Sequence, residues 1–218
     1  MPDYSKPDHW SLKAQKEGYP ARSVYKFKEM DEKFGLIKPG RPMNVLDLGA
    51  APGSWSLYIL RKFSRTSGGS GSGQSSLVSV DLSPLSRQYD QGLFNSPEFL
   101  FIQGDFTLSE IRETIHSRGP YKLLVSDAAP ATTGNRSVDT LRSLELAETA
   151  LDYARTALVQ GGNLVIKVFQ GGDTGSLLKT MRGLFENAKS FKPQACRAES
   201  FETYFLGLGK NQDQKADF

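Results

Sequence analysis

Short apolar runs alternate along the chain with longer segments in which apolar residues recur at helical spacing. The apolar runs predict strands at residues 43–47, 77–81, 99–103, 122–126, 163–169 and 203–208. The helical spacing predicts helices at residues 22–34, 55–62, 107–116, 138–160 and 175–187. Strands that alternate with helices are typical of an α/β fold with a doubly wound, mainly parallel sheet, and this is the fold class that we expect.

Two segments fall outside this alternation. Residues 1–21 are mostly polar, and we expect them to be loosely ordered. Residues 67–76 consist of Gly and Ser apart from one Gln, a composition typical of a flexible loop that carries no chemistry. Strand-like sequence resumes directly after this loop, so we expect residues 1–218 to form a single domain.

Composition bounds the class of protein. Hydrophobic residues make up 38% of the chain and charged residues 23%, which is typical of a globular protein in water. No apolar run is long enough to cross a membrane, and the first ten residues do not resemble a signal peptide. The single cysteine, Cys196, excludes an internal disulfide and favours a cytoplasmic location. His9 and His116 are isolated from other ligand residues, so we expect no metal site.

The net charge of +3 is unevenly distributed. Residues 1–41 carry nine Lys or Arg against six Asp or Glu, and residues 179–197 carry five against one. Two basic segments around a mildly acidic middle indicate an anionic partner such as a nucleic acid. The alternative is that both segments are ordinary solvated surface.

A turn of small residues follows the first predicted strand, in the sequence Asp47-Leu48-Gly49-Ala50-Ala51-Pro52-Gly53. Such a turn lets the backbone approach a ligand closely, and the helix that follows offers free N–H groups. The glycine spacing is neither the dinucleotide fingerprint nor a P-loop, and Pro52 removes one donor. S-adenosylmethionine, which has an adenosine and a carboxylate, fits this turn better than a pyrophosphate; an ordinary glycine turn is the alternative.

Three acids end successive predicted strands. In an open α/β sheet these positions face the crevice beside the first turn. Asp81 can accept hydrogen bonds from two ribose hydroxyls, and Asp105 can accept one from an adenine amino group beside the apolar Phe106. Asp127 ends the next strand. Each acid alone is equally consistent with a helix cap or a turn residue, so their shared position is what favours a binding site.

A lysine interrupts the apolar run Leu164-Val165-Ile166-Lys167-Val168-Phe169. A strand of this composition is expected to be buried on both faces, where an unpaired ammonium group is costly. Either Lys167 extends from the strand end into water, or its ammonium group lies in the crevice near Asp127.

In combination, these residues resemble the FtsJ/RrmJ-type ribosomal RNA large-subunit 2′-O-methyltransferases, from about residue 22 to residue 209. The landmarks are Arg22-Ser23-x-Tyr25-Lys26, the glycine turn with Trp55-Ser56, Gln103-Gly104-Asp105-Phe106, Ser126-Asp127, Lys167, and Glu202 ahead of Tyr204. Two features depart from the family: Ser54 stands where a second glycine is usual, and the Gly/Ser loop is unusual.

The resemblance implies a seven-stranded, mostly parallel sheet of the Rossmann-like methyltransferase type, with S-adenosylmethionine as cofactor. It places a catalytic tetrad on Lys26, Asp127, Lys167 and Glu202, with Lys28 as the alternative to Lys26. It places the cofactor-binding residues on Gly53, Trp55, Asp81, Asp105 and Asp127. The family's bacterial members methylate a uridine ribose in large-subunit (23S) ribosomal RNA on the assembled 50S subunit. No obligate protein partner is evident from the sequence, and we expect a monomer.

The expected reaction is an in-line transfer of a methyl group from a sulfonium to a ribose 2′-hydroxyl. Lys167 is the candidate base. Burial and Lys26 favour its neutral amine, whereas Asp127 and Glu202 favour its ammonium form, in which it would orient the hydroxyl instead. Three other functions remain open: 2′-O-methylation of transfer RNA, a non-catalytic RNA-binding role in ribosome assembly, and, disfavoured by the missing fingerprint, a dinucleotide oxidoreductase.

Overall fold

The computed structural model describes residues 8–38, 40–64, 74–197 and 199–212. Within them the strands are β1 (Asn44–Leu48), β2 (Ser76–Asp81), β3 (Phe99–Gln103), β4 (Tyr121–Ser126), β5 (Leu158–Phe169), β6 (Phe185–Phe191) and β7 (Glu202–Lys210). They form one sheet in the order β3-β2-β1-β4-β5-β7-β6. The first five strands are parallel, and β7 lies antiparallel between β5 and β6, so the prediction of a mostly parallel sheet is confirmed.

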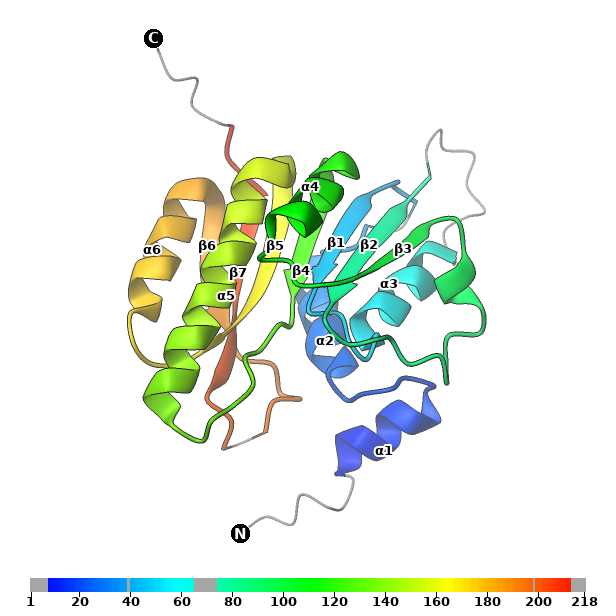
Figure 1. Cartoon of the computed structure of the whole chain (residues 1–218), viewed down its shortest axis with the longest axis horizontal. Coiled ribbons are helices and arrows are strands. Elements are labelled where there is room, and N and C mark those ends of the chain that lie inside the picture. The colour runs from blue at the N-terminus through cyan, green and yellow to red at the C-terminus, as the bar shows by residue number, and fades with distance from the viewer. Residues whose placement is uncertain (1–7, 39, 65–73, 198, 213–218) are drawn as a thin grey trace.

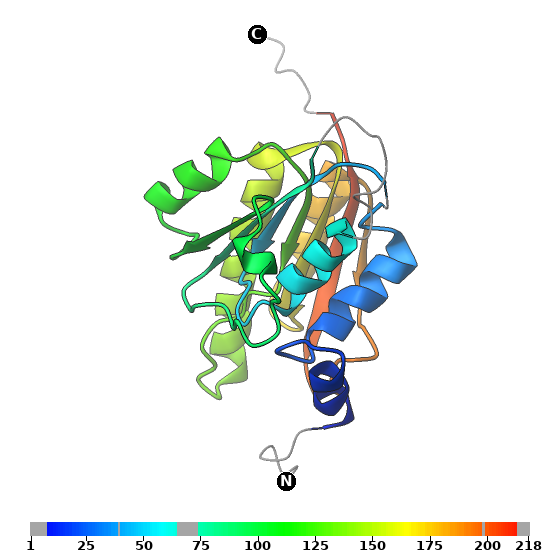
Figure 2. The same ribbon diagram turned by 90° about the vertical axis from the view of Figure 1, so that its right-hand side faces the viewer.

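Helices cover both faces of the sheet. They are α1 (His9–Lys16), α2 (Val24–Phe34), α3 (Ser54–Ser64), α4 (Ser109–Ser117), α5 (Arg136–Ala157) and α6 (Thr174–Leu184), with one short 3-10 turn, η1 (Leu93–Asn95). Apolar side chains of α2 and α3 pack with Val45 of β1 in one core, and those of α4, α5 and α6 pack with Leu46 and Leu48 in the other. Figure 1 shows the order of the elements, and Figure 2 shows the two helical layers on opposite sides of the sheet.

The prediction of a helix over residues 175–187 is wrong at its end. Helix α6 stops at Leu184, and Phe185 begins the edge strand β6. Apolar spacing misled here because Met181, Phe185 and Ala188 continue the helical period across the boundary. Pairing with β7 makes this segment a strand instead of a helical turn. The Phe185 ring packs against Gly207 of β7, where an added Cβ atom would lie 2.4 Å from the ring. A similar shift occurs at residue 158, where α5 has ended and β5 begins.

The prediction that residues 1–21 are loosely ordered is wrong for residues 9–16, which form α1. Asp8 caps this helix by accepting a hydrogen bond from the Ser11 amide at 2.9 Å. Ala14 is buried, and the Trp10 ring lies 5.1 Å from that of Tyr25. Tertiary contacts therefore order a segment whose polar composition gave little sign of structure. Residues 1–7 lie outside the described residues.

Residues 67–73 of the predicted Gly/Ser loop also lie outside the described residues, and strand β2 begins at Ser76. None of the described helices has the length and apolar character needed to cross a membrane.

Candidate active site

The turn after β1 lies against the loop after β4, and glycine makes this approach possible. Gly49 has a φ of +75°, and a Cβ atom added there would lie 2.5 Å from the Cα of Ala128. Beside these two residues opens a cavity of about 670 Å³, which is also lined by Asp81, Asp105 and Asp127. The sequence prediction that three strand-end acids share one crevice is therefore confirmed by the geometry.

Asp81 and Asp105 line the cavity, and each also stabilises the loop that follows it through hydrogen bonds. The Asp81 carboxylate accepts hydrogen bonds from the amides of Ala51 (2.9 Å) and Ser83 (2.8 Å), which ties the glycine turn to the end of β2. One oxygen of Asp105 accepts from the amide (2.8 Å) and the hydroxyl (2.7 Å) of Thr107. A carboxylate oxygen has two acceptor positions, so both acids retain capacity for a ligand.

Gly53 and Trp55 do not line this cavity. A side chain at Gly53, where φ is +104°, would meet the Phe94 ring at 2.9 Å. Trp55 is buried, donates from Nε1 to the carbonyl of Ser23 at 2.9 Å, and stacks on Phe27 with ring centroids 4.8 Å apart. Their geometry fixes the turn and the start of α2, and their predicted contact with the cofactor remains a prediction.

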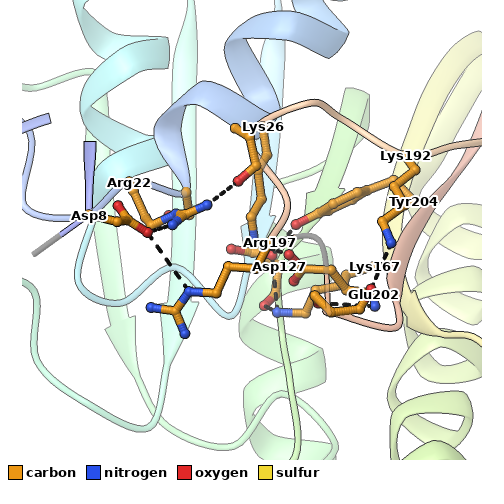
Figure 3. Close-up of polar contacts among 12 residues, drawn as sticks. Asp8, Arg22, Lys26, Asp127, Lys167, Lys192, Arg197, Glu202 and Tyr204 are labelled. Atoms are coloured by element: carbon orange, nitrogen blue, oxygen red, sulfur yellow. Dashed lines mark hydrogen bonds and ion pairs between the residues drawn. The ribbon is translucent and has the colours of Figure 1, made fainter. Parts of the chain in front are cut away.

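Four side chains come together from α2, the loop after β4, β5 and β7, namely those of Lys26, Asp127, Lys167 and Glu202 (Figure 3). The Lys167 ammonium group lies 2.5 Å from the backbone oxygen of Asp127 and 3.1 Å from its Oδ1. Lys26, in the first turn of α2, lies 2.7 Å from Oε1 of Glu202 at the start of β7. The four side chains are 9–17% exposed. The alternative in which Lys167 extends into water is therefore wrong, and of the two lysines considered, Lys26 makes the contact.

Tyr204 connects the two ion pairs, although in the sequence it is only a landmark of the family resemblance. It pairs with Lys167 in the antiparallel register of β5 and β7, and its hydroxyl donates to Oδ1 of Asp127 at 2.7 Å. The Lys26 ammonium group lies 6.0 Å from its ring centroid. Strand periodicity contained the signal, because Tyr204 lies two residues after Glu202 and so on the same face of the strand.

The two ammonium groups control the charge of Asp127. Burial alone would raise the pKa of its carboxyl, but the charges of Lys167 and Lys26 and the Tyr204 hydrogen bond outweigh burial and hold the pKa below its ordinary value. Burial and the charges of Asp127 and Glu202 raise the pKa of Tyr204 well above the usual range. At neutral pH, Asp127 is therefore an ionised acceptor and Tyr204 a neutral donor.

Asp47 lies beneath the glycine turn and is fully buried. Ser56 of α3 donates to one of its oxygens at 2.7 Å. Burial raises the pKa of Asp47 to about 7, with the nearby charges of Asp127 and Asp81 adding to the effect and the Ser56 hydrogen bond opposing it. Among the described residues, no three or more His, Cys, Asp or Glu side chains are grouped so that they could share a metal ion.

Comparison with known proteins assigns this arrangement to a family. The model of the FtsJ-like methyltransferases matches residues 19–210. The chain belongs to this family. The resemblance seen in the sequence is therefore confirmed, and as a family member the protein is an S-adenosylmethionine-dependent methyltransferase.

Relatives match over almost the full length of both chains. The chain is 50% identical over 206 residues to a protein of Treponema denticola named ribosomal RNA large subunit methyltransferase E, covering 94% of this chain and 96% of the relative. It is 44% identical over 204 residues to a protein of the same name from Borrelia garinii, covering 94% and 97%. Its fold is similar to the crystal structure of a ribosomal RNA methyltransferase from Plasmodium falciparum, with a TM-score of 0.69, 23% identity, and coverage of 88% of this chain and 98% of the other.

Proposed function

We propose that this protein transfers a methyl group to the 2′-hydroxyl of a uridine ribose in large-subunit ribosomal RNA, acting on the assembled subunit. The observation that carries the proposal is the meeting of Lys167, Asp127, Lys26 and Glu202 beside the cavity at the strand ends. The names of the relatives support ribosomal RNA as the substrate. The two paired amines and acids support hydroxyl chemistry and argue against a role limited to RNA binding.

The cavity residues fit S-adenosylmethionine. When bound, this cofactor supplies a methyl group activated by the positive charge on sulfur. Asp81 would accept hydrogen bonds from ribose hydroxyls and Asp105 would accept one from the adenine amino group, because both carboxylates line the cavity with unused acceptor positions. The absence of a side chain at Gly49 lets the glycine turn lie against Ala128, which also lines the cavity, since a Cβ there would displace Ala128.

In this proposal Lys167 first releases one proton of its ammonium group to solvent and then, as a neutral amine, accepts the proton of the acceptor hydroxyl. A neutral amine has two N–H donors and one lone pair. The two oxygens of Asp127 within reach of Lys167 match the two donors, which leaves the lone pair available for the substrate. Asp127 thus orients the amine, and Tyr204 in turn fixes the carboxylate of Asp127. A positioned base of this kind contributes about 10²–10⁴-fold to the rate.

Lys26 and Glu202 position the ribose. Their side chains line a second cavity, of about 600 Å³, beside the tetrad. Glu202 can accept a hydrogen bond from a ribose hydroxyl while Lys26 holds it in place at 2.7 Å. Holding the hydroxyl, the methyl carbon and the sulfur in line is worth several kcal/mol without any further chemistry from the protein.

The proposal is tested by incubating the purified protein with radiolabelled S-adenosylmethionine and three RNA substrates. These are assembled large subunits from cells that lack the protein, the ribosomal RNA extracted from them, and transfer RNA. We expect label only on the large subunit, in an alkali-resistant dinucleotide that contains uridine. Label on transfer RNA would replace the proposed substrate, and absence of label on all three would overturn the reaction. We also propose that the protein acts as a cytoplasmic monomer. Light scattering of the purified protein would test the monomeric state, and fractionation of cells would test the location.

A further inference from the structure

Two arginines lie at the second cavity, next to the ion pair of Lys26 and Glu202. Arg22 lies two residues before the start of α2, and Arg197 belongs to the connection between β6 and β7. Both line the cavity, together with Arg136 and Phe201, whose ring lies 5.2 Å from the Arg136 guanidinium. Two acids, Asp139 and Glu199, line it as well, but the amide of Thr133 donates to Asp139 at 2.7 Å.

Both arginines contact a single carboxylate, that of Asp8. Arg22 forms an ion pair with Oδ2 of Asp8, and Nε of Arg197 lies 3.9 Å from the same oxygen (Figure 3). Arg22 also donates to the backbone oxygen of Ala195, so its side chain is held in place. Burial, and after it the positive charge of Arg197, lowers the pKa of Arg22, as expected for two guanidinium groups that lie close together. Guanidinium groups bind phosphate as well as carboxylate, so an oxygen of a phosphate fits the same position between the two arginines.

The chemistry of the substrate requires positive charge at this place. In RNA, the carbon that bears the 2′-hydroxyl is bonded to the carbon that bears the 3′-phosphate, so a phosphate must lie close to the tetrad whenever the hydroxyl does. The tetrad cannot neutralise it, because Lys26 is paired with Glu202 and Lys167 with Asp127. Arg22 is four residues before Lys26, and the charge of Glu202 acts on it. The cations that neutralise this phosphate are therefore expected at the rim of the second cavity.

We propose that Arg22 and Arg197 form a clamp for a backbone phosphate of the substrate RNA, and that the carboxylate of Asp8 occupies the clamp until the phosphate displaces it. This inference rests on the proposed RNA substrate and adds a second site to it. Asp8 has two roles in this account. It caps α1 through Ser11, and it holds the arginines in position while RNA is absent. The exchange replaces one anion by another, so the arginines are never left without a counter-charge.

The test separates these two roles with Asp8→Asn. Asparagine caps helices as well as aspartate does, so α1 is retained while the negative charge is lost. Binding to assembled large subunits from cells that lack the protein is measured by filter retention at several salt concentrations. Because the partly exposed ion pair no longer competes with the phosphate, we expect binding roughly two- to fivefold tighter for Asp8→Asn. Glu32→Gln, an exposed residue of α2, makes the same change in net charge and serves as the matched control, with no comparable gain expected.

A second variant keeps the test decisive. Arg197→Gln is expected to weaken binding and to lower the salt slope by about one, because one phosphate contact is lost. In the Asp8→Asn/Arg197→Gln double variant, the gain from Asp8→Asn should largely disappear. If Asp8→Asn binds no more tightly than Glu32→Gln, or if its gain persists in full without Arg197, the clamp is refuted. Calorimetric affinity for S-adenosylmethionine should not change in either variant, because neither Asp8 nor Arg197 lines the cofactor cavity. A failure of the proposed reaction would appear in the wild-type protein as absent turnover and is thereby distinguished from a failure of the clamp.

Discussion

Lys167 holds Asp127 at two points, with its ammonium nitrogen 2.5 Å from the backbone oxygen and 3.1 Å from Oδ1. The contact with the backbone oxygen fixes the position of the Lys167 ammonium group even if the Asp127 carboxylate moves. The side-chain contact, together with the Tyr204 hydrogen bond of 2.7 Å, keeps Asp127 ionised beside the cofactor cavity. One residue of β5 therefore sets both the position of the amine and the charge of the neighbouring acid.

Replacing Lys167 by Met should abolish transfer while leaving the cofactor bound. We expect turnover on large subunits to fall by about 10²–10⁴-fold, since the base is lost. Calorimetry should find the affinity for S-adenosylmethionine changed by less than about threefold, because Lys167 is not among the residues that line the cofactor cavity. Lys122→Met, which makes the same charge change on β4 near Gln160, is the control and should retain full turnover. Near-normal turnover in the Lys167 variant would remove it from the chemistry.

The Lys26–Glu202 pair should show strong energetic coupling. Each side chain is only 12% exposed, so Lys26→Met or Glu202→Gln alone leaves a largely buried charge without its partner. In urea unfolding, a double-mutant cycle should give a coupling energy of about 1–3 kcal/mol. The same cycle on the exposed pair Arg155 and Asp152, 3.1 Å apart, should give less than about 1 kcal/mol. Equal coupling in the two cycles would contradict the burial that we describe.

Gly49→Ala should damage cofactor binding. The new Cβ would lie 2.5 Å from the Cα of Ala128, and the φ of +75° strains any side chain. Overpacking of this kind costs about 1–3 kcal/mol, and displacement of Ala128 should weaken S-adenosylmethionine binding by roughly tenfold or more in calorimetry. Gly183→Ala in α6 meets no atom within 4 Å and should leave binding unchanged while stabilising the protein by about 0.5–1 kcal/mol. Unchanged affinity in the Gly49 variant would show that the turn can relax.

Asp47 should make the protein less stable as the pH rises. Its pKa is raised by burial from 3.8 to about 7, so between these values the folded protein keeps the proton and the unfolded chain has lost it. Ionisation therefore favours unfolding, and this contribution to the free energy of unfolding declines from about pH 4 to about pH 7 and is constant above. Asp47→Asn mimics the protonated form. Its stability relative to wild type, measured by urea unfolding across this range, should rise with pH; a constant difference would show that the carboxyl is not perturbed.

The sequence predicted the parts of the site that local pattern determines. A lysine in an apolar run is costly unless paired, which singled out Lys167, and acids at strand ends singled out Asp81, Asp105 and Asp127. Lys26 and Glu202 were predicted only from the family resemblance. A lysine near the start of a helix and a single acid before a strand are common at protein surfaces, so their local sequence does not indicate a catalytic role. Their 2.7 Å contact depends on α2 packing against the end of β7, which is a tertiary fact.

The errors share a physical cause. Phe185 has the spacing of a helical residue, and pairing of β6 with β7 overrides it. Helix α1 is polar by composition, and the contacts of Trp10 and Ala14 order it. Tyr204 escaped notice as a functional candidate because its partner, Asp127, lies 77 residues away in sequence, and only the pairing of β4 with β5 and of β5 with β7 brings them together. In each case the deciding interaction is non-local.

The central claim is that Lys167 and its three partners act on a ribose 2′-hydroxyl of ribosomal RNA. The most direct measurement is a map of ribose methylation, by resistance to alkaline hydrolysis, in large-subunit RNA from cells in which the natural gene is replaced by the Lys167→Met variant. We predict that one 2′-O-methyluridine present with the wild-type protein is absent with the variant. A map that is identical for the two proteins would contradict the account.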